Sequence, residues 1–504
     1  MGKYLLGLDN GGTVTKAAIF DYSGNEIAVS STKSDMLFPH AGFTEKKPEE
    51  FWNANINAIR DVIARAKIDP ADITALAVTG FGNGMLLIDE AGSPVYDLIV
   101  STDSRAKDYV LNWYADGTYD EIYKISNQTI WSGQPVALLA WFRDNMPEIP
   151  DRAKWVMLCQ DYIRYRLTGE IFAEITGYSG TNTVSLETGH YDERLFKKFG
   201  IEKYFDKFPP LKNSADICGY VTEEAAALTG LKAGTPVAGG LFDIHACHLA
   251  SGVIDDKKLG IIAGTWSINE YVATSPVMDK NLFMNSISCL PGKYLASEGN
   301  PTSASNLDWF VQEMMPAEKA EFAARGENIY HHLDEVVEKI DVNESNVIFL
   351  PALFGSNSNP YAKGCLMNME SWHKREHIVR AFYEGIVFSS RYNFEKIEKH
   401  VGTFALGSIA GGPSRSKVWV QIFSDVMQMP LEVIGSKELG ALGAAICAGV
   451  GTGVFKSFEE AVNSMVRVSY ICYPDKSKAE AYQRKYKIYK KVLELSEALG
   501  GKPD

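Results

Sequence analysis

Two aspartates stand beside glycines at points where an apolar strand gives way to another element. Asp9 lies in LLGLDNGGTVTKAAIFD, and Asp243 follows a glycine pair in TPVAGGLFDIHACHLASG. Glycines let a ligand approach the backbone, and hydroxyls with free N–H groups suit a phosphate. An aspartate meets a phosphate through a divalent cation, whereas the dipole of a first helical turn keeps a carboxylate ionised, as a general base requires.

Each aspartate also has a plainer interpretation. Asp9 alone fits an ordinary Asx-type turn at a strand end equally well. Asp243 alone fits an acid that only stabilises the first turn of its helix. Taken together, both follow the carboxyl end of a strand, where open α/β sheets bind their ligands, so the pair indicates a cleft above the sheet.

The opening hairpin has a second copy about half a chain later. KLGIIAGTWSINEYV repeats the order of apolar strand, glycine, threonine, hydroxyl and second strand, so Leu5–Phe20 corresponds to Leu259–Val272. Such a repeat predicts two similarly built lobes. Each lobe would offer a glycine–threonine hairpin, formed by Gly12 and Thr13 in the first copy and by Gly264 and Thr265 in the second, to grip one polyphosphate between them.

A third glycine pair lies in IAGGPSRSKVWVQIFSDV, between a strand and a helix. Gly411 and Gly412 would let a flat group such as adenine lie against the backbone, with Ser414 and Ser416 as hydrogen-bond partners. A plain strand-to-helix turn fits these residues nearly as well.

Several other signatures are missing or incomplete. His245 and His248 share a helix face, but no HExxH pattern or second cluster supplies further zinc ligands, so we expect histidines that pack in the core or support a neighbour. The chain has no Walker A motif and no GxSxG elbow, and GVGTG near Gly449 lacks the remainder of a dinucleotide fingerprint.

The elements that must position these residues alternate between strands and helices. We expect a helix over residues 48–66, a buried strand over 73–80, and a strand running into a helix that stops at Gly169. A glycine-studded helix follows at ELGALGAAICAGVG, and a charged helix of mixed sign ends the chain. This alternation predicts layered α/β architecture.

Bulk composition narrows the class of protein. A chain of 504 residues is longer than a single hydrophobic core usually supports. We therefore expect two domains, residues 1–252 and 253–504, joined near Gly252–Leu259. A net charge of −13 without a Lys/Arg run argues against nucleic-acid partners. Seven scattered cysteines indicate reduced thiols. With no leader pattern and no apolar run of transmembrane length, we expect a cytoplasmic protein without a membrane partner.

Over nearly its whole length the sequence resembles the FGGY family of carbohydrate kinases, within the actin-like and hexokinase-like ATPase superfamily. The stretches GLDNGGTVTKAAIFD, AGTWS, GGLFDIHACHLASG, AGGPSRSKVWVQIFSDVMQMP and KELGALGAA carry the resemblance. It departs from the family pattern at Gly12, which stands where threonine is common, and at Leu138 and Asn368. The resemblance implies an α/β fold of two ribonuclease-H-like (actin/hexokinase-type) domains with a cleft between them.

The same resemblance implies roles for individual residues. Asp243 would be the general base, and Asp9, with Asp243, would hold Mg²⁺. The expected ATP-binding residues are Gly12, Thr13, Thr15, Lys16, Gly264, Thr265, Gly411, Gly412 and Ser416. VTGFGNGMLLIDEAGSPVYDLIVSTDSRA aligns with the family's sugar-binding stretch, which makes Asn83, Gly84, Asp103 and Arg105 substrate candidates beside Asp243.

The substrate stretch is most similar to the L-xylulose/3-keto-L-gulonate kinase group. Asn83 and Ser101 stand where D-xylulose kinases have histidine and tryptophan, and NQTIWSGQPVALLAW adds to the likeness. A ketopentose or related sugar acid is therefore the first expectation, with D-xylulose, gluconate and glycerol as alternatives. An actin- or chaperone-like ATPase and a sugar-sensing regulator are the rival classes, and the oligomeric state is left open, a homodimer being one option.

Overall fold

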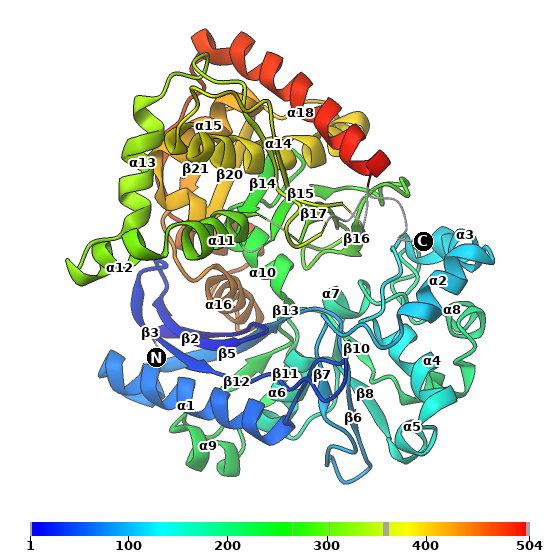
Figure 1. Cartoon of the computed structure of the whole chain (residues 1–504). Coiled ribbons are helices and arrows are strands. Elements are labelled where there is room, and N and C mark those ends of the chain that lie inside the picture. Colours follow the sequence, from blue (N-terminus) through cyan, green and yellow to red (C-terminus); the bar gives the residue numbers. More distant parts are fainter. Residues whose placement is uncertain (1–2, 265, 302, 356–361, 500–504) are drawn as a thin grey trace.

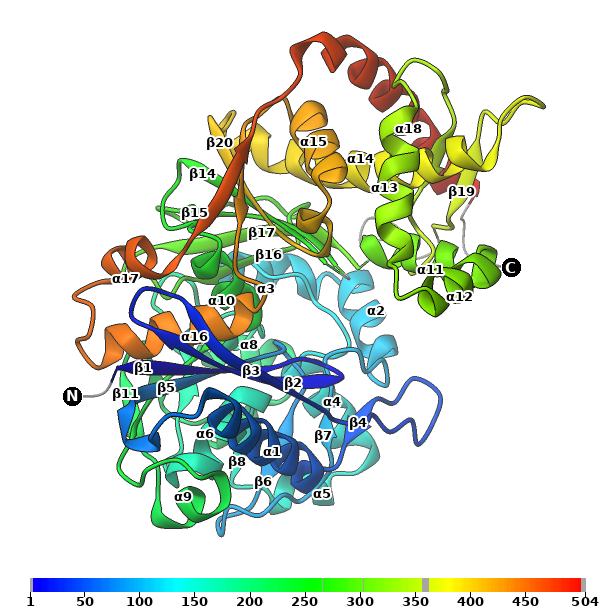
Figure 2. The same ribbon diagram turned by 90° about the vertical axis from the view of Figure 1, so that its left-hand side faces the viewer.

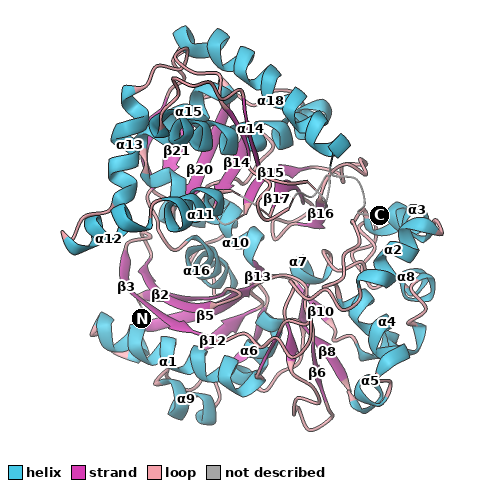
Figure 3. Ribbon diagram, in the orientation of Figure 1, coloured by secondary structure: helices cyan, strands magenta, loops and turns pink. Residues whose placement is uncertain are grey.

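The computed structural model describes residues 3–264, 266–301, 303–355 and 362–499, and a large sheet lies in each half of this part of the chain (Figures 1 and 3). The first sheet has the strand order β11-β12-β5-β1-β2-β3, with β13 also paired to β5. Its strands are β1 (Tyr4–Asn10), β2 (Val14–Asp21), β3 (Glu26–Lys33), β5 (Ile73–Gly80), β11 (Ile217–Tyr220), β12 (Pro236–Ala238) and β13 (Leu241–Phe242).

The second sheet has the order β16-β17-β15-β14-β20-β21-β22. Its strands are β14 (Lys258–Ala263), β15 (Ser267–Ala273), β16 (Met284–Ile287), β17 (Tyr294–Asn300), β20 (Leu406–Gly411), β21 (Leu431–Ile434) and β22 (Val468–Cys472). In both sheets a central strand, β1 or β14, pairs antiparallel with the next strand of its hairpin and parallel with a later strand, β5 or β20. The repeat predicted from the two hairpins is confirmed, and the fold is that of two ribonuclease-H-like domains.

Helices of the first half surround the first sheet and fill the region beside it. They are α1 (Pro48–Ala66), α2 (Lys107–Ala115), α3 (Thr118–Ser126), α4 (Pro135–Asn145), α5 (Glu148–Arg152), α6 (Cys159–Thr168), α7 (Ile175–Tyr178), α8 (Glu193–Lys198), α9 (Glu223–Thr229) and α10 (Asp243–Ala250). The expected bounds of α1, and the stop of α6 at Gly169, are confirmed.

Helices of the second half are α11 (Ala304–Met314), α12 (Pro316–Ala324), α13 (Ile329–Lys339), α14 (Arg375–Val401), α15 (Lys417–Met427), α16 (Leu439–Gly451), α17 (Phe458–Met465) and α18 (Ala479–Leu499). Short two-stranded ladders join β4 (Glu45–Lys46) to β7 (Leu98–Ile99), β6 (Leu86–Ile88) to β8 (Trp155–Met157), β9 (Ala173–Glu174) to β10 (Leu211–Lys212), and β18 (Ile348–Leu350) to β19 (Cys365–Met367). Among the described residues, no helix combines the length and the apolar character needed to cross a bilayer.

Alternating side chains of β1 and β2 build two separate cores, one on each face of the first sheet. Leu6 and Leu8 pack with α1, whereas Leu5 and Ala18 pack with α16. These two helices lie on opposite faces of the sheet (Figure 2). This alternation is the period-two pattern of a strand buried on both faces.

In the sequence, helix α16 lies between strands β21 and β22 of the second sheet, but it packs on the first sheet. It lies with α10 between the two sheets (Figures 1 and 2). A Cβ on Gly7 of β1 would stand 1.8 Å from the Ala441 carbonyl oxygen, and one on Gly443 would stand 2.1 Å from the Ala246 oxygen. The glycines therefore set how closely α16 approaches β1 and α10. The division at residues 252 and 253 stays a prediction.

Candidate functional site

Asp9 and Asp243 lie at the same edge of the first sheet. Asp9 is near the carboxyl end of β1, and Asp243 begins α10 directly after β13. Both strands run parallel to β5, and Asn10 and Phe242 both pair with Gly80. Because parallel strands end together at one edge, the two carboxylates are brought to either side of β5, as expected for a ligand site in an α/β sheet.

The two carboxyls are partly desolvated and interact with each other. Burial raises the pKa of Asp243 to about 7, the negative charge of Asp9 adds to the shift, and a backbone hydrogen bond at Ile244 opposes it. Burial likewise raises the pKa of Asp9 to about 6, against the positive charge of Lys16. A carboxyl pair with raised pKa values can serve as a proton acceptor near neutral pH and as a site for a hard divalent cation.

The start of α16 closes one side of Asp9. A Cβ on Gly440 would stand 2.5 Å from Asp9 Oδ2, so any residue other than glycine at this position would clash with the carboxylate. Glu438, just before the helix, accepts a 2.8 Å ion pair from Lys16 Nζ in β2. Lys16 therefore ties the first hairpin to α16. In the sequence it was expected among the ATP-binding residues, and this contact gives it a positioning role as well.

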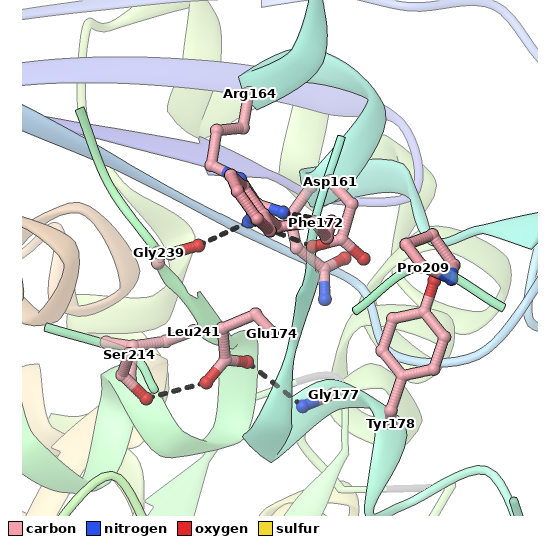
Figure 4. A network of polar contacts seen from close by, with 12 residues as sticks. Asp161, Arg164, Phe172, Glu174, Gly177, Tyr178, Pro209, Ser214, Gly239 and Leu241 are labelled. Atoms are coloured by element: carbon pink, nitrogen blue, oxygen red, sulfur yellow. Dashed lines mark hydrogen bonds and ion pairs between the residues drawn. The ribbon is translucent and has the colours of Figure 1, made fainter. Parts of the chain in front are cut away.

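A buried polar network holds the strand that carries Asp243 (Figure 4). Arg164 donates to the Gly239 carbonyl oxygen at 2.6 Å, just before β13. At the other end, the Phe242 N–H donates to Thr176 Oγ1 at 3.0 Å, and that hydroxyl donates to Glu174 Oε2 at 2.6 Å. The carboxylate of Glu174 also caps the first turn of α7.

This network leaves little freedom to residues 239–242, the short segment just before the base. Gly240 has φ +89°, and a Cβ there would stand 2.1 Å from the Val78 oxygen of β5, so the segment also lies tight against its neighbouring strand. Nothing in the sequence pattern around Glu174 or Thr176 indicated this role, because the contact from Phe242 to Thr176 joins segments far apart in the chain.

Replacing Thr176 by valine should lower the free energy of unfolding by about 1–3 kcal/mol, because the buried Phe242 N–H loses its acceptor and Glu174 loses a donor. The measurement is urea-induced unfolding followed by fluorescence. The exposed Thr403→Val is the matched control and should shift stability by less than about 0.5 kcal/mol. Equal effects in the two variants would contradict the assigned hydrogen bonds.

The tip of the first hairpin is accessible to solvent, but the hydroxyl of one of the expected ATP-binding residues, Thr15, is buried. Thr13 is exposed and Gly12 is half-buried, so both are available at the turn. Thr15 is fully buried, and its hydroxyl donates to Asn10 Oδ1 at 3.0 Å. Its hydrogen bond holds the hairpin together, and a direct phosphate contact from Thr15 stays a prediction.

The second hairpin and the third glycine pair lie side by side. Ala263 pairs with Gly411 across β14 and β20, which places Gly264 next to Gly412 at the carboxyl edge of the second sheet. Gly411 has φ +101°, and a Cβ added to it would clash with Ala263. A Cβ added to Gly412 would meet open space. Thr265 lies outside the described residues.

Ser416 has two local partners. Its Oγ accepts from the Trp419 N–H as the N-cap of α15 and donates to Asp334 Oδ1 at 2.7 Å. The nearby Ser414 hydroxyl donates to the Gly411 oxygen at 2.7 Å. These bonds fix the turn that carries Gly411 and Gly412, so the serines shape the surface beside the glycines.

Asn83 and Gly84 form a left-handed turn close to two other loops. Their φ angles are +62° and +68°, and Asn83 is 2% exposed. The Gly84 N–H donates to the Gly133 oxygen at 2.8 Å, and a Cβ on Gly133 would stand 2.1 Å from the Ser101 oxygen. Asn83 Oδ1 has no hydrogen-bond partner among the described residues, so it is a buried acceptor without a donor.

Asp103 and Arg105 are bound to each other inside the protein. Arg105 donates to both oxygens of Asp103 at 2.9 Å and to Glu45 Oε1 at 2.6 Å, with its guanidinium 4.0 Å from the centre of the Phe43 ring. Asp103 Oδ2 also accepts from the Thr44 N–H. Arg105 thus joins the loop of Ser101–Arg105 to β4. The sequence identified the pair but not Glu45 or Thr44, which are distant in the chain.

Comparisons with known proteins cover almost the whole chain. The N-terminal domain of the FGGY family of carbohydrate kinases matches residues 4–250, and its C-terminal domain matches residues 259–452. A probable L-xylulose kinase of Pasteurella multocida is 33% identical over 98% of this chain and 99% of that protein.

Two further sugar kinases are similar to this chain over nearly its full length. The L-xylulose/3-keto-L-gulonate kinase of Escherichia coli is 32% identical over 98% of this chain and 97% of that protein. The crystal structure of xylulose kinase from Rhodospirillum rubrum has a TM-score of 0.88 at 25% identity, covering 99% of this chain and all of that one. The resemblance drawn from the motifs is thus confirmed over the full length.

Proposed function

Since the chain belongs to the FGGY family of carbohydrate kinases, we propose that it transfers the γ-phosphoryl group of ATP to a hydroxyl of L-xylulose or a related ketopentose or sugar acid. The observation that carries the proposal is the carboxylate pair at the edge of the first sheet, with Asp9 near the carboxyl end of β1 and Asp243 directly after β13. In this proposal the pair acts together with the two glycine–threonine hairpins, which the family resemblance assigns to the phosphates.

In the proposed reaction, Asp243 orients the sugar hydroxyl and accepts its proton as the hydroxyl oxygen attacks the γ-phosphorus. Its pKa of about 7 leaves a large fraction ionised at neutral pH. Phosphoryl transfer has a loose transition state, so positioning and charge neutralisation supply most of the rate enhancement. The network around Glu174 and Arg164 would contribute by holding the base in place.

The residues present fit a Mg²⁺ ion. Two interacting carboxyls with raised pKa values form an oxygen site that a divalent cation would stabilise in the ionised form. Asp9 and Asp243 would hold the ion, which when bound supplies charge neutralisation to the phosphates. Nucleotide contacts are proposed for Gly12, Thr13, Lys16, Gly264, Gly411 and Gly412, with Thr15 and Ser416 shaping the turns beside them.

The substrate class rests on the names of the relatives and on the sugar stretch. Proteins 32–33% identical over nearly full length carry the names L-xylulose kinase and L-xylulose/3-keto-L-gulonate kinase. Asn83 offers a buried amide oxygen without a donor, a group suited to a sugar hydroxyl. We propose Asn83, Gly84 and Asp103 as the sugar-facing residues, with Arg105 holding Asp103.

A coupled ADP-release assay over a sugar panel tests this proposal. The panel contains L-xylulose, 3-keto-L-gulonate, D-xylulose, gluconate and glycerol, with a no-sugar control. We expect the highest kcat/KM with L-xylulose or 3-keto-L-gulonate. A tenfold preference for another member would reject the substrate, and rapid ADP release that no sugar increases would reject the proposed transfer.

The activity should rise with pH through about 7. A raised pKa means that Asp243 is mostly protonated, and unable to accept a proton, at pH 6, whereas it is ionised at pH 8. We expect kcat/KM for MgATP, at saturating sugar, to fall by about tenfold per pH unit well below the midpoint. Because Asp9 and Asp243 interact, the midpoint belongs to the pair. A flat profile between pH 6 and 8 would contradict the assignment.

A cytoplasmic location is part of the proposal, and it accords with the cysteines, all seven of which are free of disulfide bonds. A homodimer is the oligomeric state that size-exclusion chromatography with light scattering would test.

A further inference from the structure

Two histidines and a cysteine from distant segments meet at the junction of the two halves. His245 and His248 lie one turn apart on α10, and Cys289 lies between β16 and β17. One ring nitrogen of each histidine and the Cys289 sulfur all lie within 4.8 Å of one another, and all three residues are buried. The third donor, which the sequence did not reveal, thus comes from the other half of the chain.

In this cluster, hydrogen bonds hold one ring nitrogen of each histidine and leave the other nitrogen to act as a metal ligand. His248 Nδ1 is 2.8 Å from the Val253 carbonyl oxygen, which can only accept, so Nδ1 carries the proton. His248 Nε2 is therefore unprotonated, and it accepts a hydrogen bond from the Cys289 thiol at 3.9 Å, so its lone pair points at the sulfur. His245 Nε2 pairs with Ser286 Oγ at 2.8 Å, while its Nδ1 has no partner among the described residues. Metal-binding histidines are oriented in this way, through the second nitrogen.

The donor set suits a borderline-soft cation. Imidazole nitrogen and thiolate sulfur are the ligands of Zn²⁺, whereas Mg²⁺ prefers oxygen. Tetrahedral Zn²⁺ holds such atoms roughly 3.3–3.7 Å apart, which follows from its bond lengths. The observed cluster needs side-chain movements of about 1 Å to reach that spacing.

A cavity gives access to the cluster. It has a volume of about 680 Å³ and is lined by Cys289 and Ser288, by Ser214 and Asp216 of the first half, and by the loop before α17. Cys289 is the member of the cluster that lines this cavity, and the other lining residues come from both halves of the chain. The carboxyl of Glu174 is close enough to Cys289 to interact with it electrostatically, so a negative group is at hand to balance a bound cation.

We propose that His245, His248 and Cys289 form a binding site for one Zn²⁺ ion, with the remaining coordination position open to water from the cavity. Binding forms two Zn–N bonds and one Zn–S bond, and the displaced thiol proton leaves to solvent. The ion would join α10, which begins at Asp243, to the β16–β17 connection of the second half. This site is separate from the carboxylate site and does not depend on the identity of the sugar.

Cobalt binding tests the site without reference to kinase activity. Chelator-stripped full-length protein is titrated with Co²⁺ in excess Mg²⁺, which occupies oxygen sites. We expect a thiolate-to-cobalt absorption band that saturates at one equivalent and is lost on adding one equivalent of Zn²⁺. Cys289→Ser should lack the band, whereas the control Cys247→Ser, which changes a neighbouring cysteine on α10 outside the cluster, should keep it.

Direct Zn²⁺ titration of His248→Asn should show affinity at least about tenfold weaker than wild type. Near-ultraviolet circular dichroism verifies that each variant is folded. Absence of the band in folded wild-type protein would overturn the proposal, and so would its persistence in Cys289→Ser. If Cys289→Ser fails to fold, the wild-type band and the His248→Asn affinity still decide the question.

Discussion

Replacing Asp243 by asparagine should lower kcat by about 10²–10⁴-fold, the range for loss of a general base, while sugar binding persists. Asparagine keeps the size of the side chain but cannot take the hydroxyl proton. Asp243 stands at the first position of α10, held by the network on either side of β13, so the neutral variant should keep its place. The measurements are ADP release for turnover and calorimetry for sugar binding, with a dissociation constant within about threefold of wild type.

Glu270→Gln is the matched control for this change. Glu270 in β15 is fully buried, and burial raises the pKa of its carboxyl well above the usual range, with the charge of Asp243 adding to the shift. Burial therefore favours the neutral form of this carboxyl, and the amide replaces it with a neutral group of the same size. We expect kcat to stay within about threefold of wild type. Turnover retained in Asp243→Asn would remove Asp243 from the role of base.

The sequence predicted the frame of the site well because the frame is set by local patterns. Strand β5 and helix α1 have the expected bounds because an unbroken apolar run and an amphipathic repeat are each read within one segment. Asp9 and Asp243 were singled out for the same reason, since Asp9 lies near the end of its strand and Asp243 directly follows its own. The repeat of the hairpin then predicted two similarly built lobes, and the matching strand orders of the two sheets confirm them.

The missing part of the site consists of contacts between segments that are distant in the chain. Glu174 and Thr176 support β13 from about seventy residues away, and Glu45 meets Arg105 across sixty. Such pairs leave no periodic pattern in a single sequence. From its sequence neighbours alone, each side chain would be interpreted as a turn or surface residue. Cys289 is the sharpest case. The two histidines lacked a third donor in the sequence, and only folding brings that sulfur to α10.

Replacing Asp9 by asparagine should raise the Mg²⁺ concentration needed for half-maximal activity by about 10–100-fold, the size typical for weakening a metal site, and should lower kcat at physiological Mg²⁺. Removing one of two interacting carboxylates reduces the negative charge that holds the cation. High Mg²⁺ should therefore restore part of the activity of Asp9→Asn but none of that of Asp243→Asn, since metal cannot replace a proton acceptor. The measurement is kcat against free Mg²⁺ at saturating ATP and sugar.

Glu438→Gln is the control for Asp9→Asn. It tests whether the change in Mg²⁺ requirement comes from the charge of Asp9 itself or from the loss of any negative charge nearby. Glu438 pairs with Lys16 at 2.8 Å, and that pair is partly exposed, so its loss should cost no more than about 1 kcal/mol. Its Mg²⁺ requirement should stay within about threefold of wild type. An unchanged Mg²⁺ requirement in Asp9→Asn would instead assign the cation to Asp243 alone. In that case Asp9 would be a buried carboxyl with a raised pKa that does not contact the cation, lying beneath Gly440 of α16, where no side chain larger than glycine fits.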